Sequence, residues 1–349
     1  MNNMGCDCIN FIPATFKPSK IVEFLEFVGY RFQGKKKTDE YVVYSMTFFE
    51  FIDYKYKEGV SLEIYDFGID REIEISTHTS IWRSADDTDF HNYTIKKIKE
   101  RFGGWFHSDY GRNRYFKISS DRLSGAEAGV LYAYESFCEN LKTITMITNY
   151  LENNNEGVIQ TFDGEFSFLN KYNPKVMIAN ILIPYVISLT EEFFRASYIA
   201  LLRYSSVRDK IISSSNRLGG DELVRIQNKE MDVCEAISKW LNFQEISKVS
   251  SHFCAINKKI DVSGVFRKYK RNKLNGYDLF SQFIERRHDL IHRASYDHDY
   301  TKESIIRDIK DINNLIGFIY LHIAFVNGWE VDKYRNVSIL ELPKGNLRV

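Results

Sequence analysis

The chain has 349 residues, of which 44% are hydrophobic and 27% are charged, which is typical of a globular protein. Lysine plus arginine and aspartate plus glutamate balance at 47 each, so the overall charge neither indicates nor excludes a nucleic-acid partner. The five cysteines are odd in number and scattered, and therefore do not form a disulfide framework. This length predicts two domains, each with its own core.

Residues 1–120 are expected to form a mixed α/β domain. A serine cap and helical apolar spacing predict a helix over residues 18–28. Alternating β-branched and aromatic residues predict strands at residues 41–48, 60–65 and 72–77. A second helix, over 88–102, is expected to stop at Gly103 and Gly104. A hairpin is expected at 105–118, with its tip near 109–113.

Residues 121–340 are expected to form a second, all-α domain, because long apolar segments with helical periodicity replace the strand signals. The expected helices are 123–151, 174–206, 221–243, 245–257, 277–292 and 301–327, and 158–172 stays unassigned. The predicted fold class is therefore α+β, with an N-terminal α/β domain followed by a helical bundle.

Two apolar runs, 176–189 and 315–326, need to be considered as membrane spans. Both are shorter than the roughly 20 residues that a spanning helix needs, and Asn180 and Pro184 interrupt the first run. We interpret both runs as buried core helices and predict no membrane association. The first residues show no basic-then-apolar leader pattern, so we expect a cytoplasmic protein.

One short segment of the predicted helix 277–292 carries the clearest chemistry: Arg287-His288-Asp289-Leu290-Ile291-His292. An imidazole can take the proton of an RNA 2′-hydroxyl near neutral pH. A guanidinium can stabilise the charge that grows on the phosphoryl oxygens. Together these groups could cleave RNA through its own 2′-hydroxyl, with no metal or other cofactor.

This segment resembles the R-x4-H motif of the HEPN superfamily of helical ribonucleases, in which a polar residue usually follows the arginine. The resemblance covers about residues 120–335 and implies a helical up-and-down core. Residues five apart on a helix lie about 140° apart around its axis, so Arg287 and His292 would not meet within one chain. The resemblance implies a homodimer in which two motifs share one cleft.

Roles for individual residues follow from the same resemblance. His292 would be the general base or acid, Arg287 would stabilise the transition state, and His288 would orient the phosphate or the other histidine. The family tends to place an acidic residue near the motif, which makes Glu191 and Glu192 candidates; the alternative is that both face solvent.

The implied function is a metal-independent endoribonuclease of the toxin or abortive-infection, antiphage type. Its substrate would be tRNA or another single-stranded RNA, and its products would carry a 2′,3′-cyclic phosphate and a 5′-hydroxyl. Such an enzyme needs restraint, so the N-terminal domain is expected to respond to a protein or ligand trigger.

Two basic clusters could contact RNA, through phosphates and through bases stacked on aromatic rings. The candidate contacts of the first cluster, together with one arginine of the motif helix, are Arg267, Lys268, Tyr269, Lys270, Arg271 and Arg286. The second cluster could bind either nucleic acid or a protein trigger, and combines nearby aromatic residues with Lys96, Lys97, Lys99, Arg101, Arg112 and Arg114. A solvated charged face is the alternative for both.

Two other functions remain open. A catalytically inactive HEPN-like domain would act as an RNA-binding or dimerisation scaffold. Alternatively, His288 and His292 form an H-D-x-x-H pattern, which has the spacing of metal ligands on one helix face. A metal-dependent hydrolase of this kind could draw a third ligand from Asp297, His298 or Asp299, although two arginines beside the site disfavour a dication.

Overall fold

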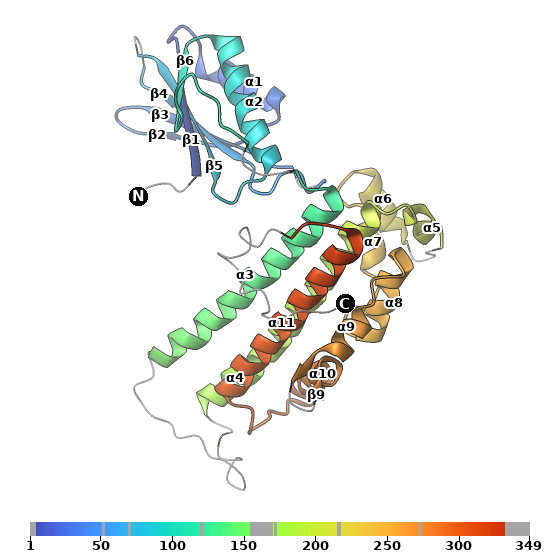
Figure 1. Cartoon of the computed structure of the whole chain (residues 1–349). Coiled ribbons are helices and arrows are strands. Elements are labelled where there is room, and N and C mark those ends of the chain that lie inside the picture. Colours follow the sequence, from blue (N-terminus) through green and yellow to red (C-terminus); the bar gives the residue numbers. More distant parts are fainter. Residues whose placement is uncertain are drawn as a thin grey trace. The chain divides into compact units, whose positions relative to one another are not determined.

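A computed structural model describes residues 5–331 except 51–52, 69–70, 119–121, 154–169, 171–172, 215–217 and 272–273. The chain divides into two compact units, Met1–Ala128 and Gly129–Val349 (Figure 1). The first is built on an antiparallel sheet and the second is helical, which confirms the α+β fold class at this level. Of the unassigned segment 158–172, all but Asn170 lies outside the described residues.

The first unit contains a seven-stranded antiparallel sheet in the order β2-β3-β4-β5-β1-β6-β7. Its strands are β1 (Gly5–Ile12), β2 (Arg31–Lys37), β3 (Val42–Phe48), β4 (Val60–Asp66), β5 (Ile73–Ser80), β6 (Trp105–Ser108) and β7 (Gly111–Arg112). The strands expected in β3, β4 and β5 are confirmed, and so is a hairpin of β6 and β7. This hairpin is shorter than the expected 105–118, since β7 ends at Arg112, and its turn lies at residues 109–110. The sequence did not predict β1 and β2, although β1 lies inside the sheet between β5 and β6.

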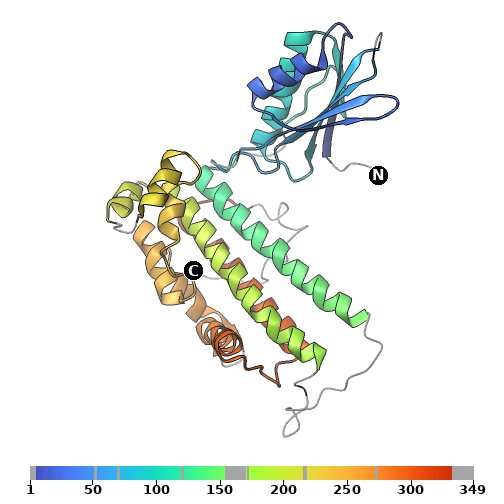
Figure 2. The ribbon, with the colours of Figure 1, turned by 180° about the vertical axis from the view of Figure 1, so that it is seen from behind.

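Helices α1 (Pro18–Val28) and α2 (Ala85–Phe102) cover one face of the sheet (Figure 2). Ile21 and Leu25 of α1 and Ile98 of α2 pack against alternate residues of the strands to form the core. A capping box at Ser84 and Asp87 fixes the start of α2. The Asp87 carboxylate is fully buried, and it also accepts hydrogen bonds from three successive backbone N–H groups before β4.

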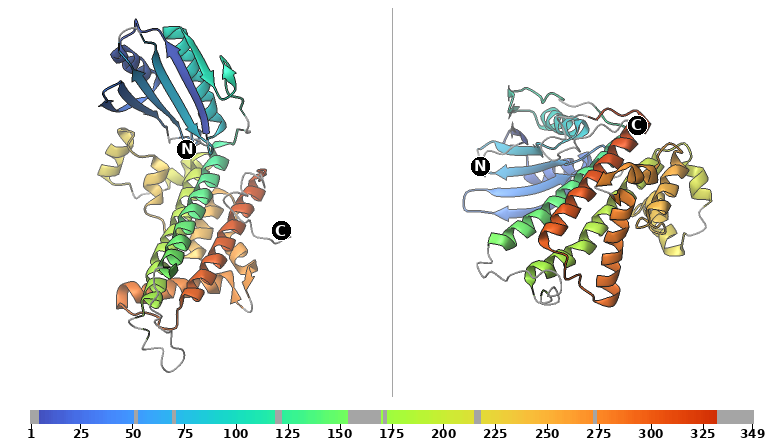
Figure 3. Two further views of the ribbon diagram at one scale, coloured as in Figure 1. Left: turned by 90° about the vertical axis from the view of Figure 1, so that its left-hand side faces the viewer. Right: turned by 60° about the horizontal axis from the view of Figure 1, so that its bottom comes forward.

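The second unit is organised around three long helices that lie side by side (Figure 3): α3 (Gly125–Asn153), α4 (Pro174–Arg203) and α11 (Lys302–Asn327). Tyr134 of α3 joins them, since its ring lies 4.5 Å from that of Tyr320 on α11 and 6.2 Å from that of Phe193 on α4.

The shorter elements of this unit are α5 (Arg208–Ser213), α6 (Gly220–Gln227), α7 (Val233–Ser238), α8 (Ile246–Ile256), α9 (Val262–Lys268), β8 (Lys270–Arg271), β9 (Leu274–Asn275) and α10 (Gly276–Arg293). The single helix expected over 221–243 is wrong, because a turn separates α6 from α7. In that turn Lys229 is left-handed, with φ of 59°.

Helices α4 and α11 contain the two apolar runs considered as membrane spans. At 30 and 26 residues they are long and apolar enough to cross a bilayer. The expectation that both segments are too short to span one was therefore wrong. Half of the most apolar stretch of each helix is buried inside the protein. A core helix of a soluble protein passes the same test, so the two helices are weak evidence for a span, and the absence of membrane association stays a prediction.

Candidate functional site

Helix α10 carries the Arg287–His292 motif and is anchored at both ends. Its N-cap is Asn275, whose side chain accepts a hydrogen bond from the backbone of Asp278 at 3.0 Å. Phe280 and Phe283 bury one face of the helix. At the other end Ala294 adopts the left-handed conformation, with φ of 49°, and closes the last turn. The motif therefore lies in the final two turns of a well-defined helix.

Gly276, the first residue of α10, permits a close approach to the core. A Cβ built there would lie 2.6 Å from Leu315 Cδ2 and 2.8 Å from the carbonyl oxygen of Phe266. Both distances are shorter than real Cβ contacts. The absence of a side chain at this position therefore lets α10 pack against both α9 and α11.

The motif residues separate into two groups. His288 and His292 are exposed, and their ring centroids lie 4.6 Å apart. Arg287 is half-buried, and its Nη1 donates to Gln244 Oε1 at 3.1 Å, in the turn before α8. Its Nε is buried and has no hydrogen-bond partner among the described residues. One chain thus brings together the two imidazoles and holds the arginine elsewhere, as the five-residue helical spacing predicts.

The histidine pair has the spacing of two metal ligands, but no third ligand completes a cluster among the residues that the structure describes. The described residues contain no group of three or more His, Cys, Asp or Glu that could hold a metal ion. Of the three expected candidates, Asp297 is paired with an arginine instead. The hypothesis of a complete metal site within one chain therefore finds no support.

Arg286 is half-buried and its guanidinium is paired within the chain, which disfavours the RNA contact expected from the sequence. Its Nε donates to Asp297 Oδ2 at 3.1 Å, and its Nη1 lies 3.8 Å from Asp308 Oδ2. Its guanidinium also lies over the ring of Tyr300, 4.7 Å from the centroid, and the Tyr300 hydroxyl donates to Asp308 at 2.9 Å. Arg286 therefore fastens α10 to the following loop and to α11.

A side chain of α4 holds the same loop. Asn180 Nδ2 donates to the Asp297 carbonyl, and the Asp297 N–H donates to Asn180 Oδ1, each at 3.0 Å. Asn180 is almost fully buried, so this two-way pairing satisfies an amide in an otherwise apolar helix. The sequence showed Asn180 only as an interruption of an apolar run.

The two glutamates proposed for the site differ in their surroundings. Glu192 is exposed and pairs with Arg195 at 2.9 Å, which disfavours a catalytic role for it. Glu191 is half-buried, and its Oε1 is buried with no hydrogen-bond partner among the described residues. No ion pair between Glu191 and Arg287 or a motif histidine occurs in the described part of the chain. Glu191 remains the candidate of the two.

The basic cluster before α10 is only partly available to RNA. Arg267 and Lys268 end α9 and are exposed, as is Lys270 in β8. Arg271 follows in β8, which pairs with β9. Tyr269 is half-buried, its hydroxyl donates to Asp311 at 3.0 Å, and its ring packs near Phe318. These contacts disfavour the expected stacking of a base on its ring.

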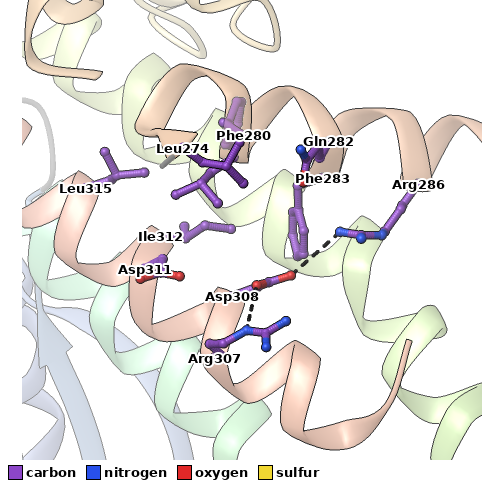
Figure 4. Close-up of a pocket in the computed structure, with 11 residues that line it drawn as sticks. Leu274, Phe280, Gln282, Phe283, Arg286, Arg307, Asp308, Asp311, Ile312 and Leu315 are labelled. Atoms are coloured by element: carbon purple, nitrogen blue, oxygen red, sulfur yellow. Dashed lines mark ion pairs between the residues drawn. The ribbon is translucent and has the colours of Figure 1, made fainter. Parts of the chain in front are cut away.

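A pocket of about 130 Å³ opens between α10 and α11, with an apolar floor and a charged end where Arg286, Arg307 and Asp308 meet (Figure 4). Successive helix residues are about 100° apart, so Phe283, which lines the pocket, is on the opposite side of α10 from His292. The pocket is therefore separate from the histidine pair.

In comparisons with known proteins, no family model, no curated protein and no solved structure matches this chain.

Proposed function

We propose that this protein is a metal-independent endoribonuclease of the HEPN type that acts as a homodimer in a toxin or antiphage role. The observation that carries the proposal is the end of α10. There two exposed imidazoles lie 4.6 Å apart, on a helix that also bears the half-buried Arg287 and that Arg286 and Asn275 hold in place. The resemblance of the motif supplies the substrate class and the biological role.

Two neighbouring imidazoles suit cleavage of RNA by its own 2′-hydroxyl. His292, as the base, takes the 2′-hydroxyl proton while the 2′-oxygen attacks the phosphorus. The bond from phosphorus to the 5′-oxygen breaks, and a protonated imidazole donates a proton to that oxygen. This leaves a 2′,3′-cyclic phosphate and a 5′-hydroxyl. His288 lies close enough to His292 to take part in proton transfer or to orient the phosphate.

A second copy of the chain would complete the site. Arg287 lies on a different side of α10 from His292, and within one chain it donates to Gln244. If two α10 helices meet around a twofold axis, the arginine of one protomer can face the histidines of its partner. There it would stabilise the charge on the phosphoryl oxygens. Arg267, Lys268 and Lys270, all exposed, would attract the phosphates flanking the cut.

The test is cleavage of total tRNA and of a labelled single-stranded RNA by the purified full-length protein in EDTA. Wild type should cut, His292→Ala should be slower by roughly 10²–10⁴-fold, and His288→Ala should also lose rate. Arg293→Ala is the matched control, since Arg293 is exposed, adjacent and paired only with Asp289 in the described part of the chain. Cleavage that His292→Ala retains would refute the proposal.

Mixing two inactive variants tests the shared cleft. Arg287→Ala and His292→Ala protomers that exchange should recover cleavage, because a mixed dimer carries one intact arginine and one intact histidine. A wild type that dimerises and binds RNA but leaves it uncut in EDTA would instead identify an inactive scaffold. Cleavage only after metal is added would identify the metal-dependent alternative.

A further inference from the structure

The N-terminal sheet has one face that α1 and α2 leave uncovered. Strand register places four side chains opposite one another across neighbouring strands: Tyr65 on β4, Glu74 on β5, Phe11 on β1 and Trp105 on β6. Side chains alternate between faces along a strand, and the adjacent residues Ile12 and Ile64 lie in the core beneath the helices. The four aligned residues therefore belong to the opposite face.

Two of these side chains, Phe11 and Trp105, form a stacked column with Arg112 of β7, which lies on the same face. The rings of Phe11 and Trp105 lie 4.1 Å apart and within 15° of parallel. The guanidinium of Arg112, on β7, lies 4.5 Å from the centroid of the Trp105 ring. Arg112 is exposed and makes no ion pair with a described residue. The column thus presents a flat cation to solvent, a group on which a nucleobase can stack.

The far edge of the same sheet is strongly basic. Strand β2 carries four exposed cations, none paired with a described carboxylate: Arg31, Lys35, Lys36 and Lys37. Register places Arg31 and Lys36 on the uncovered face, opposite Thr47 and Val43, whereas Lys35 and Lys37 lie opposite Tyr44 and Val42 on the helical face. Lysines on an edge strand also oppose aggregation, so this feature alone does not indicate a ligand. With strands about 4.8 Å apart, β2 and β7 are separated by roughly 29 Å, the span of a few nucleotides.

The centre of the face is acidic and hydroxylated. Glu63 and Glu74 lie there, and the Tyr65 hydroxyl donates to Glu63. Carboxylates would repel the phosphates of a double helix laid across the sheet. They would instead accept hydrogen bonds from the amino groups of unpaired bases.

From these contacts we infer that the uncovered face of the N-terminal sheet binds single-stranded nucleic acid, with bases toward the column of Phe11, Trp105 and Arg112 and phosphates toward the basic edge. Aromatic and guanidinium planes recognise unpaired bases, and the flanking cations recognise the phosphates. The inference does not depend on cleavage at α10, so either could fail without the other.

The experiment measures binding of the full-length protein to a labelled single-stranded dodecamer with 2′-O-methyl sugars, which α10 chemistry cannot cut. The same sequence as single-stranded DNA and as a duplex serves for comparison. Phe11→Leu should weaken binding of the single strands roughly five- to a hundredfold, as loss of a stacking ring does. Arg112→Gln should also weaken it and lower its dependence on salt.

Matched controls come from the helical side of the unit. Phe27→Leu changes a ring on α1 that is 92% exposed, and Lys17→Gln changes an exposed cation at the start of α1 that makes no side-chain cap bond; both should bind like wild type. The inference is overturned if wild type does not bind the single strands, if the duplex binds as tightly, or if Phe11→Leu and Arg112→Gln behave like their controls. RNA and DNA strands that bind differently would show whether the sugar contributes.

Discussion

One histidine of the sheet unit and two histidines of the helical unit have opposite surroundings. In the sheet unit His91 is fully buried, and its Nε2 lies 2.7 Å from the hydroxyl of Thr77, which donates in turn to the carbonyl of Cys8. Burial lowers the pKa of His91 to about 3, so the ring is neutral near neutral pH. In the helical unit His288 and His292 are exposed at a helix end.

This difference separates a histidine that supports the fold from histidines available for chemistry. The ring of His91 joins α2 to the sheet and cannot exchange protons with a substrate. The two rings on α10 contact each other and solvent, so they can. The sequence alone does not show whether a histidine supports the fold or is available for chemistry, because that depends on the packing around its ring.

The largest expected effect comes from two adjacent arginines of the helical unit, one expected to serve chemistry and the other expected to support the fold. Arg287→Gln should slow RNA cleavage by roughly 10²–10³-fold, because the charge on the phosphoryl oxygens loses its stabilising donor, and should lower stability by about 1 kcal/mol at most, through the lost hydrogen bond to Gln244. Arg286→Gln should affect cleavage less and stability more, by about 1–3 kcal/mol, since it loses two carboxylate partners and a ring contact. Cleavage rates and thermal melts measure both. Equal effects of the two changes on cleavage would contradict the assignment.

The second prediction concerns the close packing of the start of α10 against the core. Gly276→Ala should destabilise the protein by about 1–3 kcal/mol, because the added Cβ meets Leu315 and the Phe266 carbonyl. The matched control is Gly220→Ala, also at the start of a helix, where the new Cβ would meet no atom of another described segment within 4 Å. Urea denaturation of both variants checks this. A Gly276→Ala protein as stable as the control would show that α10 does not need this close approach.

The third prediction tests the buried histidine of the sheet unit. The pKa of His91 is lower in the folded state than its ordinary value, so as pH falls the unfolded chain takes up the proton first. Its contribution is present above about pH 6.5 and is lost progressively as pH falls toward 3, amounting to about 2 kcal/mol between pH 7 and pH 5. His91→Gln should remove that part of the pH dependence. Denaturation measured at both pH values decides, and an unchanged slope would contradict the argument.

The smallest expected effect concerns the two glutamates. Glu192→Gln should change stability by less than about 0.5 kcal/mol, because its ion pair with Arg195 is exposed, and should leave cleavage unchanged. Glu191→Gln keeps the shape of a half-buried group and should alter cleavage more than its neighbour does. Rates for both variants under one set of conditions provide the check. Loss of cleavage in Glu192→Gln alone would reverse the choice between them.

Regular spacing of apolar residues made several elements predictable. An element whose buried side chains are small or polar was not recognised from the sequence. Helices α1, α10 and α11 follow the expected ranges closely, because their buried positions are large and apolar. Strand β1 was missed because its inward side chains include Cys6, Cys8 and Asn10, whereas Phe11 faces outward. The alternation is present in β1, but its inward face is built of small and polar residues as well as Ile12, and its outward face carries Ile9 and Phe11.

The candidate site was predictable only along its own helix. The spacing of Arg287, His288 and His292 on α10 follows from local periodicity. The contacts that position them come from distant segments, including Gln244, Asn180 and Asp297, and no local pattern pairs residues so far apart. Arg286 and Tyr269 were expected to contact RNA, because a charge or ring in a basic stretch does not reveal which partners it has in the fold.

The backbone amide of Asp297 donates a hydrogen bond to Asn180. Exchange of that amide proton therefore measures how firmly the end of the motif helix is attached to α4. The loop after α10 cannot leave α4 without exposing that amide to water, so its exchange with deuterium reports how often the end of α10 detaches. Slow exchange would describe a site built to stay assembled. Exchange that slows further when RNA or a second protomer is added would describe a site that its partner completes.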